Sequence, residues 1–209
     1  MSEHRSYNIP TDSISIEYEI KRSRFIADVA HITSKQEAMA FIQQVRNHYP
    51  DARHHCWAYI AGHPVESIER GMSDDGEPQG TAGKPMLNVL QHKKVGEIII
   101  VISRYFGGIK LGAGGLVRAY SHASQLAMDA LPLKQLIATT TINLTLPFNM
   151  ENSVRHLLEK HNVSITNCDY QQQVFMQAEV ANNIKKDLKD VLTNLGRGKI
   201  TIIFPKESE

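Results

Sequence analysis

Hydrophobic and polar residues alternate over the first part of the chain and then change to a helical spacing. The alternation at 14–31 predicts two strands. From Ser34 the apolar positions recur as on a helix, with Glu37 placed to complete a capping box and Pro50 ending the run. Residues 55–60 then predict a third strand, which enters the core.

The middle of the chain combines a long loop, a buried strand and a glycine-rich turn. Glycine and proline recur over 61–80 and predict the loop, and a short helix is expected near 86–90. The uninterrupted apolar run 98–102 predicts a strand covered on both faces. A glycine-rich turn then leads into a helix over about 116–131. Such a turn favours anion binding, because glycine lets the backbone come close and the first N–H groups of a helix are free.

A boundary is expected near Pro132-Leu133-Lys134, after which the pattern restarts. The expected elements are strand 139–147, helix 150–161, strand 163–169, strand 172–180, helix 182–195 ending with Gly196 at its C-cap, and strand 199–204. This βαββαβ order is ferredoxin-like. The fold class predicted is therefore α+β, with two two-layer α/β domains at 1–135 and 136–209.

Composition places the chain among ordinary globular proteins. Of its 209 residues 42% are hydrophobic and 22% charged, which excludes a disordered tail, a fibrous repeat and a disulfide-rich scaffold. Cys56 and Cys168 lie far apart and outside any C-x-x-C pair, so two free thiols are expected. The N-terminal residues lack the apolar core of a secretory signal, and the longest apolar run is too short to span a bilayer. A cytoplasmic protein without a membrane segment is expected.

Sequence motifs for common enzymes are missing. Gly83-Lys84 resembles the end of a P-loop, but Pro78 stands where that motif needs its first glycine. Pro85 stands where it needs the magnesium-binding hydroxyl. The sequence contains no nucleophile elbow, and no catalytic residue, cofactor or metal-ligand set is predicted.

Charge is nearly balanced overall, at a formal +1, but it is unevenly distributed. Residues 66–77 hold five acidic residues against one basic residue, and 91–118 hold five basic residues against one acidic residue. Basic side chains contact phosphates and exposed aromatic rings stack on bases, so the second segment predicts nucleic-acid contacts. The candidate residues are Lys93, Lys94, Arg104, Tyr105, Lys110 and Arg118. The alternative interpretation is that Tyr105 and Phe106 pack in the core and the lysines are solvated.

A long signature resembles that of the IMPACT family, and more closely its bacterial YigZ branch. It comprises Arg53–Trp57, Ser73–Pro78, Gly80–Pro85 and Arg104–Gly112. Its fixed positions include Asp74, Asp75, Gly76, Glu77, Pro78, Gly83, Lys84, Gly107, Gly108 and Gly112.

The resemblance implies a ribosomal-protein-S5-domain-2-like fold for about 14–132 and a second domain like domain V of the elongation factor that drives translocation. Eukaryotic members are implicated in translational control through an initiation-factor kinase and its activator, and no catalytic residues carry over. We therefore expect a non-enzymatic protein that binds RNA or the ribosome and modulates translation, with a translation-related protein as another candidate partner. The alternative is an enzyme acting on a small phosphorylated or nucleotide ligand at the glycine-rich turn, with a metal held by Asp74, Asp75 or Glu77. A third hypothesis uses the C-terminal sheet as a protein-binding surface.

Overall fold

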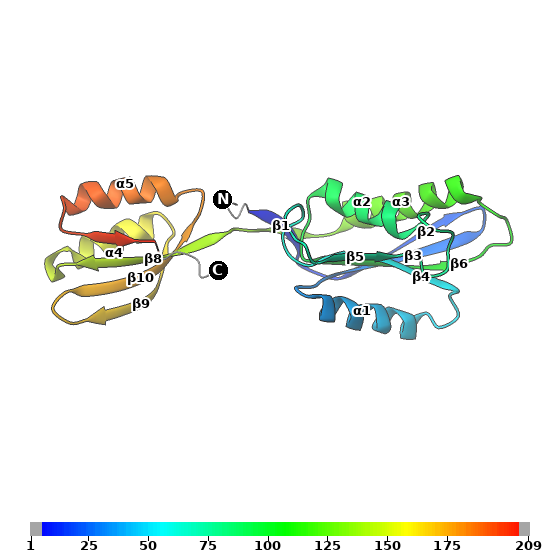
Figure 1. Ribbon diagram of the computed structural model, residues 1–209, viewed down its shortest axis with the longest axis horizontal. Helices are drawn as coiled ribbons and strands as arrows, with labels where there is room; N and C mark the ends of the chain where they lie inside the picture. Colours follow the sequence, from blue (N-terminus) through cyan, green and yellow to red (C-terminus); the bar gives the residue numbers. More distant parts are fainter. Residues whose placement is uncertain (1–5, 205–209) are drawn as a thin grey trace. The chain divides into compact units, whose positions relative to one another are not determined.

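The computed structural model describes residues 6–204, and the chain divides into two compact units. The N-terminal unit is Tyr7–Leu136, and the C-terminal unit begins at Ile137. The N-terminal unit contains a five-stranded antiparallel sheet (Figure 1). Its strands, in spatial order, are β2 (Ile14–Ile20), β3 (Ser23–His31), β6 (Ile98–Tyr105), β4 (His54–Ile60) and β5 (Arg70–Ser73).

Helices cover both faces of this sheet. α2 (Gly83–Lys93) and α3 (Ala113–Ala130) lie on one face, and α1 (Lys35–His48) lies on the other (Figure 1). Alternate residues of β6 enter the two cores: Ile98, Ile100 and Ile102 pack with α2 and α3, and Ile99 and Val101 pack with α1. The predicted double coverage of this strand is confirmed. The α+β class is also confirmed, and α1 adds a third layer to the two that were predicted for this unit.

The predicted start of α1 is present with one change of partner. The Ser34 side chain accepts a hydrogen bond from the Glu37 backbone N–H, as a capping box requires. The Glu37 carboxylate, however, accepts from the N–H of Thr33 at 2.6 Å, one residue earlier than predicted. Both bonds satisfy N–H groups that a helix start leaves without helical partners.

Two short pairings were not predicted. β5 lies inside the expected loop 61–80 and pairs with β4 along the edge of the sheet. β1 (Tyr7–Pro10) pairs antiparallel with β7 (Leu133–Leu136), inside the stretch interpreted as a boundary. These strands have four residues each, too few for a visible alternation, and β1 and β7 come from opposite ends of the unit.

The C-terminal unit has the predicted ferredoxin-like arrangement. Its antiparallel sheet follows the order β11 (Thr201–Ile203), β8 (Thr139–Leu146), β10 (Val174–Ala181) and β9 (Ser164–Tyr170). η1 (Phe148–Met150) leads into α4 (Glu151–Lys160), which packs with α5 (Lys185–Gly196) on the buried residues of the sheet. The predicted cap at Gly196 is wrong by one residue. Gly196 is still helical, and Arg197 (φ +43°) and Gly198 (φ +82°) make the left-handed turn.

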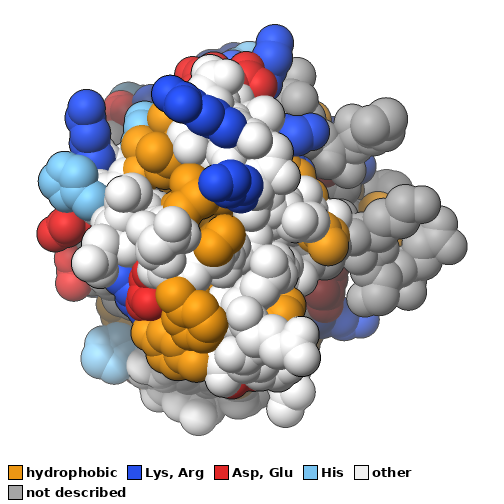
Figure 2. Space-filling view, turned by 90° about the vertical axis from the view of Figure 1, so that its left-hand side faces the viewer, with side chains coloured by type: hydrophobic (Ala, Val, Ile, Leu, Met, Phe, Trp, Pro, Cys, Tyr) orange, Lys and Arg blue, Asp and Glu red, His pale blue; other side chains and the backbone are white. Residues whose placement is uncertain are grey.

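The surface of the C-terminal unit carries scattered hydrophobic side chains. Figure 2 shows one face of this unit, on which small hydrophobic groups are separated by charged and polar side chains. The two aromatic side chains Phe148 and Tyr170 are 53% and 55% exposed, and their rings are nearly parallel with centroids 6.5 Å apart. Within residues 6–204 we find no helix with the length and apolar character needed to cross a membrane.

Candidate functional site

The structure does not bring the six predicted basic and aromatic residues together. Lys93 and Lys94 precede β6, whereas Arg104 and Tyr105 end it. A strand of eight residues separates them by about 24 Å, at about 3.4 Å per residue. Lys93 is moreover paired with Asp129 at 2.5 Å. The six residues predicted to contact nucleic acid therefore fall into two groups, near opposite ends of β6.

Arg104 forms part of the protein interior. Its side chain is 8% exposed, and its Nη1 donates to Oε1 of Glu77 at 2.5 Å. The guanidinium lies 5.5 Å from the ring centroid of Phe25 and 5.8 Å from that of Phe106. Its Nε is buried and has no hydrogen-bond partner within the described chain. Arg104 therefore builds a wall of the site and is not a free surface cation.

The acidic segment Asp74–Glu77 is a tight turn. Asp75 (φ +41°) and Gly76 (φ +85°) both lie in the left-handed region, and the Glu77 N–H donates to the Asp74 carbonyl at 2.9 Å. Two consecutive positive φ values are typical of a type I′ turn, which explains a glycine at the second of these positions. The turn directs the acidic side chains of Asp74, Asp75 and Glu77 to three different sets of partners.

Asp74 caps the start of α2. Its carboxylate accepts hydrogen bonds from the backbone N–H groups of Gly80, Ala82 and Gly83, at 2.7, 2.9 and 2.9 Å. Partial burial on its own would raise the pKa of this carboxyl, but the three N–H donors together outweigh it and lower the pKa. Asp74 therefore carries a negative charge at the positive end of the helix, which stabilises α2.

The other two acidic side chains are also engaged. Asp75 pairs with Arg46 at 2.5 Å and accepts from the His55 backbone N–H at 2.6 Å, and Glu77 pairs with Arg104. No three His, Cys, Asp or Glu side chains are grouped as a metal site anywhere in the part of the chain that is described. The three acidic side chains that the enzymatic alternative offered as metal ligands are therefore each hydrogen-bonded or ion-paired within the protein.

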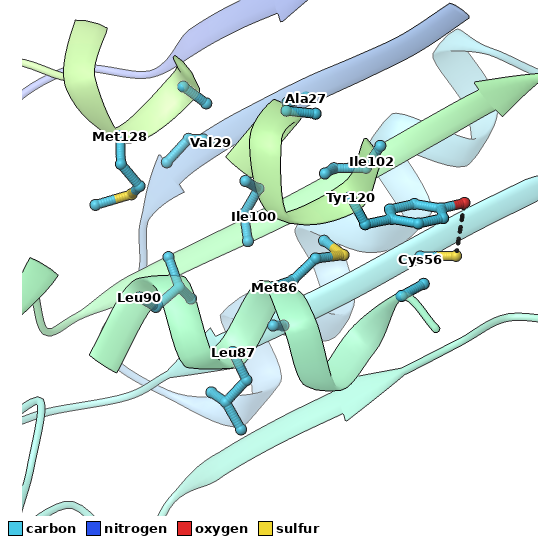
Figure 3. Packing of buried hydrophobic residues seen from close by; sticks show 14 of the residues in the cluster. Ala27, Val29, Cys56, Met86, Leu87, Leu90, Ile100, Ile102, Tyr120 and Met128 are labelled. Carbon is cyan, nitrogen blue, oxygen red and sulfur yellow. Dashed lines mark hydrogen bonds between the residues drawn. The ribbon is translucent and has the colours of Figure 1, made fainter. Parts of the chain in front are cut away.

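A chain of buried polar groups continues from Glu77 into the core. Its carboxylate accepts from the Tyr120 hydroxyl at 2.9 Å, and that hydroxyl accepts from the Cys56 thiol at 3.2 Å (Figure 3). Burial raises the pKa of Cys56 to about 12, and burial together with the neighbouring Cys56 and Glu77 raises the pKa of Tyr120. These hydrogen bonds between Cys56, Tyr120 and Glu77 were not predicted from the sequence. The one available signal was a tyrosine hydroxyl on the apolar face of α3.

A cavity of about 310 Å³ lies where β6 ends and α3 begins. Gly112 and Ala113, at the start of α3, form one side of it. Across residues 6–204 no side chain caps this helix start, and its first turn contains no acidic residue. The side chains that matter for its chemistry are Arg53, His54, Glu77, Arg104, Phe106 and Lys110.

Exposed basic side chains lie in the lining of this cavity and on elements next to it; Arg53 and Lys110 line the cavity itself, and Lys84 lines another one. The β2–β3 hairpin tip contributes two of them and touches Gly107, so it lies beside the loop that follows β6. Others come from the residue before β4, from the first turn of α2, from the loop and from the second turn of α3. We call this set the basic rim; its members are Lys21, Arg22, Arg53, Lys84, Lys110 and Arg118. Only Lys110 and Arg118 belong to the predicted nucleic-acid residues, because the other four are distant in sequence.

Gly107 allows the loop to pack against the hairpin tip. We expect Gly107→Ala to destabilise the N-terminal unit by about 1–3 kcal/mol, since a Cβ would overlap the Arg22 carbonyl group and the Ser23 nitrogen. Urea unfolding followed by the fluorescence of Trp57, the one tryptophan of the chain, measures this. The control is Gly114→Ala, whose Cβ would approach only Arg118 Nη1, at 3.7 Å. It should stabilise α3 by about 0.5–1 kcal/mol, and equal losses in both variants would contradict the packing argument.

These features define a class of protein with an α+β unit that carries a basic site and a separate ferredoxin-like unit. Residues 21–128 match the family model described as the Impact N-terminal domain, and 144–199 match a model described as a domain of unknown function. The chain belongs to the IMPACT family, which confirms the resemblance seen in its sequence.

Two bacterial relatives match nearly the whole chain, and a eukaryotic relative matches about half of it. It is 39% identical over 196 residues to an IMPACT family member of Haemophilus influenzae, covering 94% of this chain and 95% of that protein. It is 39% identical over 202 residues to the IMPACT family member YigZ of Escherichia coli, covering 97% and 99%. The Protein IMPACT homolog of Dictyostelium discoideum is 34% identical over 115 residues, covering 54% of this chain and 32% of that protein. A crystal structure titled as that of a hypothetical protein matches with a TM-score of 0.67 and 39% identity, over 98% and 99% of the two chains.

Proposed function

We propose that the protein binds RNA, free or in the ribosome, through the basic rim, and that it modulates translation in the cytoplasm without catalysing a reaction. One observation carries the proposal. The acidic side chains of the 74–77 turn have partners inside the protein, while the exposed cations Arg53 and Lys110 line the cavity together with the half-exposed Phe106. The other four exposed cations of the rim lie on the β2–β3 hairpin tip, α2 and α3.

The physical basis is the response of polyanions to local positive charge. Each lysine or arginine that neutralises a phosphate releases counterions, so affinity falls steeply with salt. With a formal net charge of +1 the whole molecule has no general attraction for polyanions. Binding should therefore depend on the rim and weaken when the charge of an individual member of the rim is reversed.

A role in translation is the part of the proposal supported by family resemblance. The match to the Impact N-terminal domain spans the region that contains the cavity and the whole rim. A ribosomal or messenger RNA target is consistent with both a basic surface and a translational role. A translation-related protein is the other candidate partner.

The test is co-sedimentation of the full chain with ribosomes and binding to labelled RNA over a salt series. Lys110→Glu should reduce affinity by about tenfold at low salt and make the salt dependence shallower. The charge-matched control is Lys35→Glu, because Lys35 is exposed and begins α1 at the opposite end of the sheet. It should bind as the wild type does. Absence of both RNA and ribosome binding at low salt, or equal losses in the two variants, would overturn the proposal.

A further inference from the structure

The size of the cavity restricts what it can hold. Its volume of about 310 Å³ lies at the lower limit of small-molecule sites, which occupy roughly 300–1,000 Å³. This is space for one nucleotide, whereas a base pair with its two backbones needs much more. An RNA bound at the basic rim can therefore fill the cavity only if a nucleotide is unpaired and turned out of the strand.

One side of the cavity suits a phosphate group. The N–H groups in the first turn of α3 have no helical partners, and Gly112 (φ +72°) begins the helix without a side chain that would block access. Arg53 and Lys110 line the same cavity and supply two exposed cations. A phosphate here would meet backbone donors and positive side chains together.

A second and independent observation also points to a ligand. Arg104 lines the cavity with a side chain more than nine-tenths buried, and its buried Nε lacks a hydrogen-bond partner within residues 6–204. Buried donors in native proteins normally have partners. Of the Arg104 nitrogens only Nη1 donates to Glu77, so the guanidinium keeps unused donor capacity at this wall.

Another part of the cavity lining suits a base. Phe106 lines the cavity, is 48% exposed, and has the Arg104 guanidinium 5.8 Å from its ring centroid. A ring held in this way offers a flat apolar surface in contact with water. Bases stack on such rings with little regard to sequence, because every base has a π-face.

We propose that this cavity takes one unpaired nucleotide, with its phosphate at the first turn of α3 beside Arg53 and Lys110 and its base on Phe106. The inference rests on the proposed RNA binding and adds a substrate class, single-stranded RNA. The basic rim contacts the flanking phosphates, which any RNA supplies. The cavity supplies the preference for an unpaired strand.

The test compares two probes on the full chain at low salt: an unstructured labelled RNA of about twelve nucleotides and the same strand annealed to its complement. The single strand should bind at least about tenfold more tightly. Phe106→Ala should remove about tenfold of that affinity, leave binding of the duplex unchanged, and leave Trp57-monitored stability unchanged. The control is Phe148→Ala, which removes an equally exposed phenylalanine from the C-terminal unit and should alter neither affinity.

The outcomes separate the two proposals. Equal affinity for both probes, or an unchanged affinity in Phe106→Ala, overturns the nucleotide cavity and leaves RNA binding by the rim intact. Failure to bind either probe or ribosomes overturns the proposed function itself. Thermal stabilisation by a mononucleotide without binding of any RNA overturns both and assigns the cavity to a small phosphorylated ligand.

Discussion

Glu77→Gln is expected to destabilise the N-terminal unit by about 3–5 kcal/mol, because it removes one partner of a buried ion pair and leaves the other charged. The Glu77 and Arg104 side chains are 4% and 8% exposed and lie 2.5 Å apart, so the arginine charge left behind would be poorly hydrated. The substitution also weakens the acceptor of the Tyr120 hydroxyl. Urea unfolding monitored by Trp57 fluorescence reports this unit, since Trp57 lies in β4.

Two further variants distinguish burial from charge. Glu17→Gln removes the partner of Arg24 in an exposed pair, with side chains 46% and 48% exposed, and should cost less than about 1 kcal/mol. The double variant Glu77→Leu with Arg104→Met replaces the buried pair by apolar side chains. It should recover part of the stability that Glu77→Gln loses, because no charge is left buried alone but the Tyr120 hydroxyl loses its Glu77 acceptor. A loss of under about 1 kcal/mol in Glu77→Gln would contradict the assignment of a buried, desolvated pair.

The sequence pattern predicted most of the fold because the relevant signals are local. The apolar run at 98–102 predicted a strand covered on both faces, and Ser34 with Glu37 located the start of α1. The βαββαβ order of the C-terminal unit likewise follows from the spacing of its hydrophobic residues, which changes between the two-residue period of a strand and the roughly 3.6-residue period of a helix. What the pattern missed, β1, β5 and β7, consists of four-residue strands whose pairing is decided by tertiary position.

The site was less predictable because charges interact in space. Counting charge over 91–118 treated neighbours in sequence as neighbours in the fold, and β6 separates Lys93 and Lys94 from Arg104. Counting acidic residues over 66–77 suggested an exposed negative loop, whereas Glu77 pairs with an arginine 27 positions away. A basic residue of one segment, Arg104, therefore forms an ion pair with an acidic residue of the other, Glu77. Arg22 and Arg53 contribute to the exposed positive charge that remains. They lie outside 91–118, so a count of charges over that segment does not include them.

Stability of the N-terminal unit is expected to fall steeply in alkali, because the Cys56 thiol and the Tyr120 hydroxyl are buried in their neutral forms. Burial raises the pKa of Cys56 from the ordinary thiol value of 9.0 to about 12. The unfolded chain therefore releases this proton at lower pH than the folded chain. The stabilisation is complete below about pH 9 and is lost as the pH rises towards 12. Tyr120, whose pKa is also raised by burial, acts in the same direction.

Comparing urea unfolding of the wild type at pH 8 and about pH 10.5 should show a loss of about 2 kcal/mol from Cys56 alone, at about 1.4 kcal/mol per pH unit above 9. Lysines and other tyrosines titrate in the same range, so the difference between variants carries the argument. Cys56→Ala should lose about 2 kcal/mol less than the wild type over this interval, whatever its stability at pH 8. Cys168→Ala, which removes the partly exposed thiol of the C-terminal unit, should lose as much as the wild type does. If Cys56→Ala and the wild type lost equal stability, the thiol would not be titrating with the raised pKa, and the alkaline response would have to come from other groups such as Tyr120.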